Sequence, residues 1–161
     1  MKKITLALLA LIAVIGLASC KSTGASQEKV NDSFYKVYCN YSSVVNLDGA
    51  ETYTVVSGDT LTAITKQFYG DKNGYYFPLI MIASNDKVLD PDLISPGMEL
   101  TIPNFDKNIK DTEQAAKLKP YFKDIANVYK IKTTPSAADI REKLLEYFDI
   151  EYKKTLSKNI E

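Results

Sequence analysis

The stretch that decides the fold is residues 53–61, Tyr-Thr-Val-Val-Ser-Gly-Asp-Thr-Leu. Its first four residues are aromatic or β-branched, which favours extended backbone. The following Ser57-Gly58-Asp59 is typical of a turn, because each of these residue types suits a backbone reversal. The stretch therefore predicts a short strand that ends in a turn.

A short helix is predicted directly after this turn. Thr60 is a suitable N-cap, because its hydroxyl can accept a hydrogen bond from a free backbone N–H of the first turn. Leu61, Ile64 and Phe68 then recur at helical spacing until Gly70. The strand is thus followed by a helix with one apolar face.

A second helix and a second strand complete this part of the chain. Residues 75–85 are nearly all apolar and about three turns long, which favours a helix in which Pro78 lies in the first turn. Residues 90–97 are rich in Asp, Pro and Gly and predict a turn. Residues 98–102 predict a short strand that Pro103 closes, so the predicted order is strand, helix, helix, strand.

Residues 53–103 resemble the LysM domain, a small carbohydrate-binding module. The resemblance implies an α+β fold, in which a βααβ module has a two-stranded antiparallel sheet with two helices on one side. Phe77 stands where the family usually has Trp, and Ser84 where it usually has Asn. The matching residues are Tyr53, Val55, Gly58, Asp59, Thr60, Leu61, Ile64, Phe68, Tyr69, Gly70, Ile80, Ala83, Asp90, Pro91, Asp92, Leu93, Ile94, Pro96, Gly97, Leu100, Ile102 and Pro103.

In the LysM family the glycan groove lies between the loop after the first strand and the loop before the last strand. A structural interpretation competes with this one, because Asp59 and Thr60 also suit a helix cap. Both interpretations remain open at this point. Carried onto this sequence, the resemblance implies a glycan site with Gly58, Asp59, Thr60 and Leu61 on one wall and Asp92, Leu93 and Ile94 on the other.

The N-terminus predicts export and lipidation. Lys2-Lys3 precedes an apolar run, which is typical of a secretory signal peptide over residues 1–19. Residues 17–20, Leu-Ala-Ser-Cys, also resemble a bacterial lipobox, in which the peptide is removed before the cysteine. We therefore expect a lipid with fatty acyl chains such as palmitate on Cys20, and a protein held on the membrane of the cell envelope, on its periplasmic or outer surface side.

Two segments separate Cys20 from the LysM-like stretch. Residues 20–32 are rich in Ser and Lys and predict a flexible lipidated tether. Residues 33–52 form an aromatic-rich extension that we cannot assign as helix or strand. Its Cys39 is expected to be a small, buried or half-buried residue rather than a reactive thiol. Because apolar side chains point all round the helix predicted at 75–85, we expect flanking sequence to cover it.

The C-terminal region, residues 104–161, predicts an antiparallel helical hairpin. Asp111 and Gln114 form a plausible N-cap pair for the first helix, and Thr133-Thr134-Pro135 is a break. A second helix starts near Ser136, and both helices carry an apolar stripe. Such a stripe supports the core of the domain or docks a protein partner.

The composition excludes several functions. The chain of 161 residues has no histidine, which removes Ser-His-Asp and Cys-His catalysis and the usual zinc sites. Twenty basic residues balance twenty acidic ones, so nothing indicates nucleic-acid binding. The carboxylates of Asp90 and Asp92 suit a turn. We expect no enzyme, no cofactor and no metal site.

The predicted function is that of a non-catalytic cell-envelope lipoprotein. Its LysM-like region would bind peptidoglycan or a chitin-like glycan that contains N-acetylglucosamine, and the lipid on Cys20 would tether membrane to wall or position a complex. The alternative is a protein-protein interaction scaffold that uses the helical flanks, with little or no glycan binding.

Overall fold

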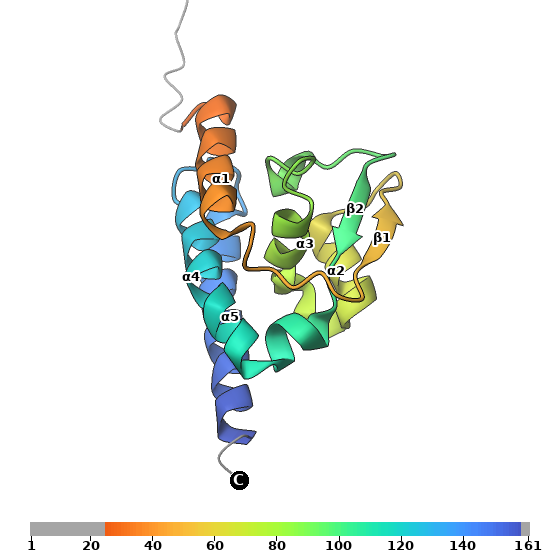
Figure 1. The fold of residues 1–161 in the computed structure, drawn as a ribbon. Coiled ribbons are helices and arrows are strands. Elements are labelled where there is room, and N and C mark those ends of the chain that lie inside the picture. The colour runs from red at the N-terminus through yellow and green to blue at the C-terminus, as the bar shows by residue number, and fades with distance from the viewer. Residues whose placement is uncertain (1–24, 159–161) are drawn as a thin grey trace, which may run out of the picture.

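The computed structural model describes residues 25–158 (Figure 1). The predicted signal peptide, Cys20 and the start of the predicted tether lie outside these residues. The elements in chain order are α1 (Gln27–Tyr41), β1 (Glu51–Thr54), α2 (Leu61–Tyr69), the 3-10 helix η1 (Asp71–Tyr76), α3 (Pro78–Ala83), the 3-10 helix η2 (Pro91–Leu93), β2 (Glu99–Ile102), the π-helix η3 (Asp106–Lys110), α4 (Thr112–Val128) and α5 (Ala137–Lys158).

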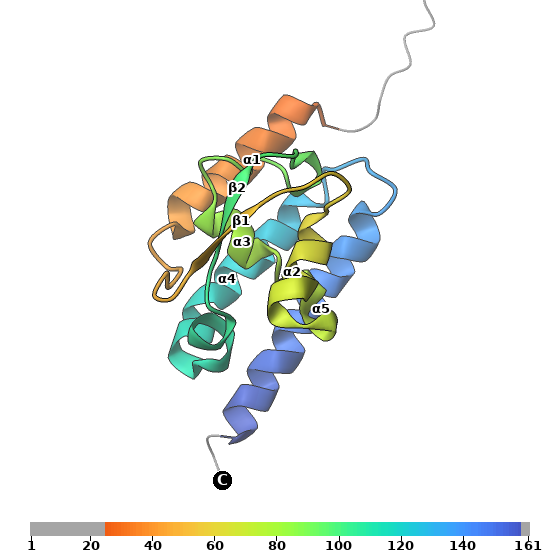
Figure 2. The same ribbon diagram turned by 90° about the vertical axis from the view of Figure 1, so that its right-hand side faces the viewer.

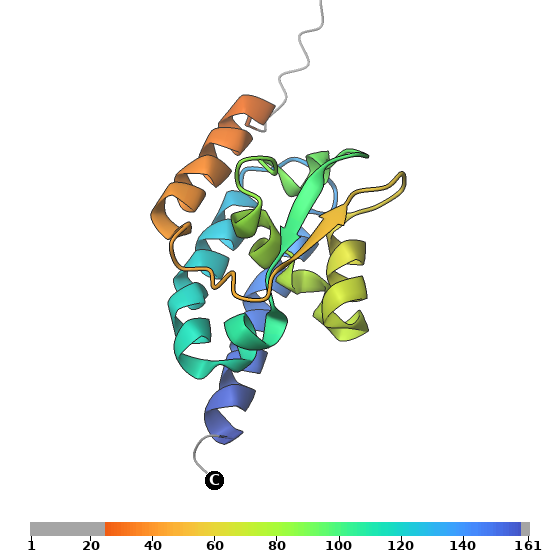
Figure 3. The same cartoon turned by 45° about the vertical axis from the view of Figure 1, so that its right-hand side comes forward.

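The predicted α+β fold is confirmed. Strands β1 and β2 pair antiparallel, with Glu51 opposite Ile102 and Thr54 opposite Glu99. The pairing extends beyond β1, because the N–H of Val55 donates to the carbonyl of Met98 at 2.8 Å. In Figures 1 and 3 the sheet lies on one side of the molecule, and α3 lies between the sheet and the helices α1 and α4.

The sequence predicted the bounds of the first helix, α2, correctly but not those of the second helix, α3. α2 is capped by Thr60, whose Oγ1 accepts from the N–H of Ala63 at 3.1 Å, and it ends before Gly70, as predicted. The helix predicted over residues 75–85 is wrong in length. Its first residues belong to η1, and α3 has six residues with Pro78 in its first turn. Pro78 lacks the N–H that would continue a hydrogen-bonded helix across this point.

Helix α1 corrects the prediction for the N-terminal segments. It begins at Gln27 with Ser26 as its N-cap, so residues 27–32 are helical rather than part of a flexible tether. Its buried residues Val30, Phe34 and Tyr38 recur every four positions, which places them on one face of a helix. The polar residues around Val30 hid this spacing in the sequence.

Cys39 also lies on α1, away from this buried face. It is exposed, so the expectation that it is buried or half-buried is wrong.

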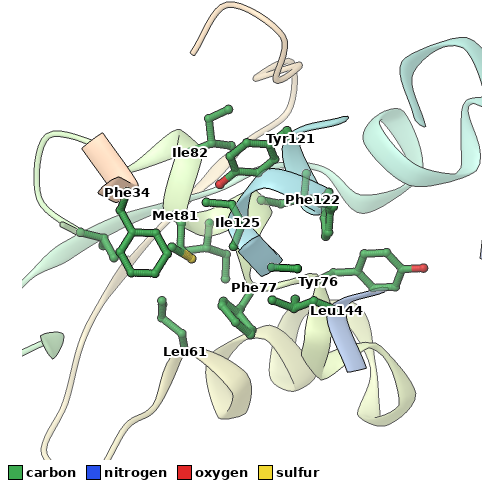
Figure 4. Close-up of a cluster of buried hydrophobic side chains, with 14 of the residues drawn as sticks. Phe34, Leu61, Tyr76, Phe77, Met81, Ile82, Tyr121, Phe122, Ile125 and Leu144 are labelled. Carbon is green, nitrogen blue, oxygen red and sulfur yellow. The ribbon is translucent and has the colours of Figure 1, made fainter. Parts of the chain in front are cut away.

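Helix α3 lies in the centre of the core, as expected from its apolar surface. Leu79, Ile80, Met81 and Ile82 are each at most 1% exposed. The hydroxyl of Tyr121 on α4 donates to the carbonyl of Pro78 at 2.8 Å. Figure 4 shows Met81 and Ile82 among side chains from α1 and α4, including Phe34 and Ile125. The prediction that flanking sequence covers this helix is confirmed, and the flanks share one core with the LysM-like stretch.

Helices α4 and α5 form the predicted hairpin (Figure 2). The rings of Phe122 and Phe148 stack at 4.6 Å, and Lys119 pairs with Asp149 at 2.8 Å. Asp111 caps α4 by accepting from the N–H of Gln114 at 2.9 Å, as predicted. Among the described residues, no helix combines the length and the apolar composition that a bilayer crossing requires.

Candidate functional site

One pocket of about 210 Å³ lies between the β1–α2 loop and the loop that leads to β2. Its inner surface is formed by buried side chains and its rim by partly exposed ones. Five of the seven predicted glycan-binding residues line it, and the structure brings them together from both loops. The lining residues are Asp59, Thr60, Leu61, Thr62, Phe77, Pro91, Asp92, Ile94, Tyr129 and Ile140.

Two of the predicted residues lie beside the pocket rather than on it. Leu93 is 51% exposed on the surface of the second loop. Gly58 has a φ of +94°, and a Cβ added there would meet no atom within 4 Å. The N–H of Asp59 donates to the carbonyl of Val56 at 3.2 Å, which closes the turn around Gly58. Glycine is thus required for the backbone conformation of this turn rather than for close packing.

Replacing Gly58 with alanine is expected to lower the free energy of unfolding by about 1–2 kcal/mol, because an L side chain is strained at positive φ. Ser57 lies in the same turn, is exposed and has no positive φ, so Ser57→Ala is the matched control. Urea unfolding of both variants measures the difference. Equal stability of the two variants would show that the turn relaxes without strain.

Asp59 and Thr60 both have structural roles. The Asp59 Oδ2 accepts from the hydroxyl of Tyr53 at 2.8 Å and from the N–H of Val56 at 2.9 Å. The hydrogen bond to Asp59 raises the pKa of Tyr53. Thr60 caps α2, as described above. The helix-cap interpretation is therefore confirmed for Thr60 and wrong for Asp59, which holds the turn instead, and both side chains also border the pocket.

The second loop is held by a buried cation. The Lys132 Nζ contacts the Asp90 carboxylate and lies 2.7 Å from the Asp92 Oδ2. The side chains of Lys132 and Asp90 are 3% and 1% exposed. Asp90 also accepts from the Asp92 N–H at 2.9 Å and from the Gln27 side-chain amide on α1 at 2.7 Å. The loop is thus tied both to α1 and to the connection between α4 and α5.

Three residues that matter here were not predicted as site residues. Tyr129 and Ile140 line the pocket from the C-terminal helices, and Lys132 holds its second loop. The sequence shows Tyr129 and Ile140 only as members of an apolar stripe. Lys132 stands next to a break between two helices, and no local pattern marks it as buried.

The charges around the pocket suit a neutral ligand. Asp92 is paired with Lys132, and Asp59 is bonded to Tyr53, so each carboxylate already has a partner. Within residues 25–158, no three Cys, Asp or Glu side chains gather where they could hold a metal ion. The pocket offers hydrogen-bonding groups from Thr60 and Asp92 beside apolar surface from Leu61 and Phe77.

Several relatives share part of the sequence. The potassium binding protein Kbp of Escherichia coli O6:H1 is 36% identical over 98 residues, which are 55% of this chain and 64% of the relative. The esterase Rv1288 of Mycobacterium tuberculosis is 42% identical over 53 residues, which are 33% of this chain and 11% of the esterase. An uncharacterised protein of Deinococcus radiodurans is 42% identical over 55 residues, which are 34% of this chain and 20% of that protein.

The chain spans less than two thirds of the length of each of these relatives. The similarity to the esterase covers only the segment around the two loops and the sheet. No solved structure matches the chain significantly. Residues 53–103 match the model of the LysM domain, and the chain therefore contains a LysM domain over these residues.

Proposed function

We propose that this protein binds the glycan strands of peptidoglycan without catalysis, through the pocket between the two loops of its LysM domain. The observation that carries this proposal is the position of Asp59, Thr60, Leu61, Asp92 and Ile94. These five residues come from two loops about thirty positions apart and line one pocket. LysM domains bind peptidoglycan or chitin-like glycans.

The chemistry of the pocket fits an N-acetylhexosamine. Such a sugar presents an amide, hydroxyls and an apolar ring face, so its receptor needs polar groups beside apolar walls. Thr60 and Asp92 supply the polar groups, and Leu61, Phe77 and Ile94 supply the apolar surface. A pocket of this size holds few sugar rings, so binding at a single site is weak.

The proposal includes the lipid attachment on Cys20 and a location in the cell envelope. A protein held at a membrane beside a polymeric wall meets many binding sites at high effective concentration, which raises the overall affinity. Such a protein would link membrane and wall or position a complex between them.

Co-sedimentation with purified peptidoglycan sacculi tests this function. We expect the full chain, solubilised in detergent, to sediment with the sacculi and to be released by N-acetylglucosamine oligomers. A well-folded protein that stays in the supernatant at all concentrations would contradict the proposal. Globular proteins of similar size without a LysM domain serve as the control for trapping.

The neighbouring residues Ile94 and Leu93 offer a matched pair of variants. Ile94 lines the pocket, whereas Leu93 is exposed beside it. Ile94→Ala is expected to weaken glycan binding about fivefold, which corresponds to about 1 kcal/mol of lost apolar contact. Leu93→Ala should leave binding unchanged. Calorimetric titration with the oligomers measures both, and equal losses in the two variants would place the ligand elsewhere.

A protein-interaction role is the second candidate. A groove of about 420 Å³ lies on the α4–α5 hairpin, where Phe122, Leu144 and Phe148 face it between Lys123 and Asp149. This groove favours a role of the helical flanks in binding another protein. Failure of sacculus binding by a folded chain would direct the search there.

The Escherichia coli relative is named for potassium binding, and we do not propose potassium binding for this chain. Paired carboxylates attract cations, and Asp90 and Asp92 form such a pair on the second loop. The ammonium of Lys132 contacts both carboxylates, so a cationic group of the chain already lies between them and offsets one of their two charges.

A further inference from the structure

Ile140 lines the pocket from outside the LysM domain. It lies in the first turn of α5, where its N–H donates to the carbonyl of Ser136 at 2.9 Å. The match to the LysM domain ends at residue 103, so α5 reaches the pocket from a later segment of the chain. The part of the lining that Ile140 contributes is therefore an addition to the LysM domain.

Ile140 lies on the inner face of α5. It stands three residues after Ala137 and four residues before Leu144, and residues at these spacings share one face of a helix. Ala137 and Leu144 are buried, with 4% and 1% of their surface exposed. Ile140 also packs against the core, but it is only partly buried. Because its neighbours on this face are covered, we attribute the exposed part of Ile140 to the pocket that it lines.

The accessible apolar surface of the pocket comes mainly from two isoleucines. Ile94 of the second loop and Ile140 of α5 both line the pocket and are both partly exposed. A ligand that enters the pocket therefore meets one isoleucine from the LysM domain and one from α5. The other apolar lining residues are buried and form the floor of the pocket, and they are Leu61, Phe77, Pro91 and Tyr129.

The side chain of Ile140 suits the apolar face of a sugar ring. The backbone of a helix is enclosed by its side chains, so a helical residue lines a pocket with its side chain. That of Ile140 carries no polar atom that would need a partner when a ligand covers it. Its branched Cβ restricts χ1, so little side-chain freedom is lost when a ring packs against it.

We propose that Ile140 is a ligand-binding residue, whose side chain packs against the apolar ring face or the N-acetyl methyl group of an N-acetylhexosamine in the pocket. This inference rests on the proposed function and deepens it. The glycan site is then built by the LysM domain together with α5. The LysM loops supply the polar contacts through Thr60 and Asp92, and α5 supplies one of the two accessible apolar contacts.

Alanine variants of Ile140 and Leu145 separate ligand contact from helix packing. Both residues lie on α5, are apolar and partly exposed, and pack against the core, but Leu145 lines the groove on the hairpin instead of the pocket. Ile140→Ala is expected to lower the affinity for the N-acetylglucosamine tetramer about threefold to fivefold, because part of the apolar contact is lost. Leu145→Ala should leave the affinity unchanged. Ile140→Val removes a single methylene group and should lower the affinity less, about twofold.

The experiment uses the full chain in detergent, calorimetric titration with the tetramer, and thermal unfolding without ligand. If Ile140→Ala does not fold, the milder Ile140→Val decides the outcome. Unchanged affinity of the folded Ile140 variants, with normal binding by the wild-type chain, overturns this inference and leaves the proposed function standing. Similar losses of affinity in Ile140→Ala and Leu145→Ala also overturn it, because the effect would then come from the packing of α5. Absence of binding by the wild-type chain would remove the proposed function and this inference together.

Discussion

The fragment of residues 51–105, which holds the entire LysM domain, is expected not to fold as a soluble monomer. In the full chain α3 is covered by α1 and α4, and Leu79, Met81 and Ile82 are at most 1% exposed. Removing the flanks would expose these side chains to water at a cost of about 1.5–3 kcal/mol each. The sum is comparable to the whole stability of a small domain, about 5–15 kcal/mol.

Far-UV circular dichroism and analytical ultracentrifugation measure this outcome. We expect the fragment to aggregate or to lack a cooperative thermal transition, whereas the matched fragment of residues 25–158 should be monomeric and melt cooperatively. A monomeric fragment of residues 51–105 with a sharp transition would show that the LysM domain is stable without its flanks.

Replacing Lys132 with methionine is expected to lower the free energy of unfolding by about 3–5 kcal/mol, as for a buried ion pair that loses one partner. The substitution keeps the apolar stem but removes the ammonium, which leaves the buried Asp90 carboxylate without its cation. The ring faces of Phe34 and Tyr129 also lose a cation that lies 5.6 and 5.4 Å from their centres.

Urea unfolding of three variants checks this prediction. Lys130→Met is the control, because Lys130 is exposed two residues away and should change stability little. The double variant Asp90→Asn with Lys132→Met should recover part of the loss, since neither charge is then left alone in the core. If Lys132→Met were as stable as Lys130→Met, the buried ion pair would be irrelevant to the fold.

The parts of the fold that local sequence decides were predictable. The order strand, helix, helix, strand follows from alternating residue types and from turn chemistry, and Thr60 caps α2 as its position indicated. The meeting of the two loops around one pocket followed from the resemblance to LysM.

Ser84 stands where the family usually has Asn. Its Oγ accepts a hydrogen bond from the N–H of Thr101 at 2.8 Å, which ties the end of α3 to β2.

The parts that long-range packing decides were not predictable. Asp90 and Lys132 are 42 positions apart, and nothing in either local sequence indicates that they meet. In the sequence, Tyr129 and Ile140 are indistinguishable from other residues of the apolar stripes. Only the packing of the α4–α5 hairpin against the loops brings them to the pocket.

Helix α1 was not recognised for two reasons. Polar residues surround Val30, at the start of its buried face, and the apolar Tyr35 and Val37 lie off that face and obscure the four-residue spacing.

The hydrogen bond between Gln27 and Asp90 has a geometric consequence for a protein held at its N-terminus. It places the first turn of α1 beside the second loop, so the chain enters the fold at the same end as the pocket. Under the proposed attachment at Cys20, six peptide steps lead to Ser26, the N-cap of α1, and at full extension they span about 20 Å. A glycan in the pocket would then lie close to the membrane surface, and the long α4–α5 hairpin would extend away from it. The distance between the membrane surface and the bound glycan would then be limited by these six peptide steps, and the length of the folded part of the chain would not increase it.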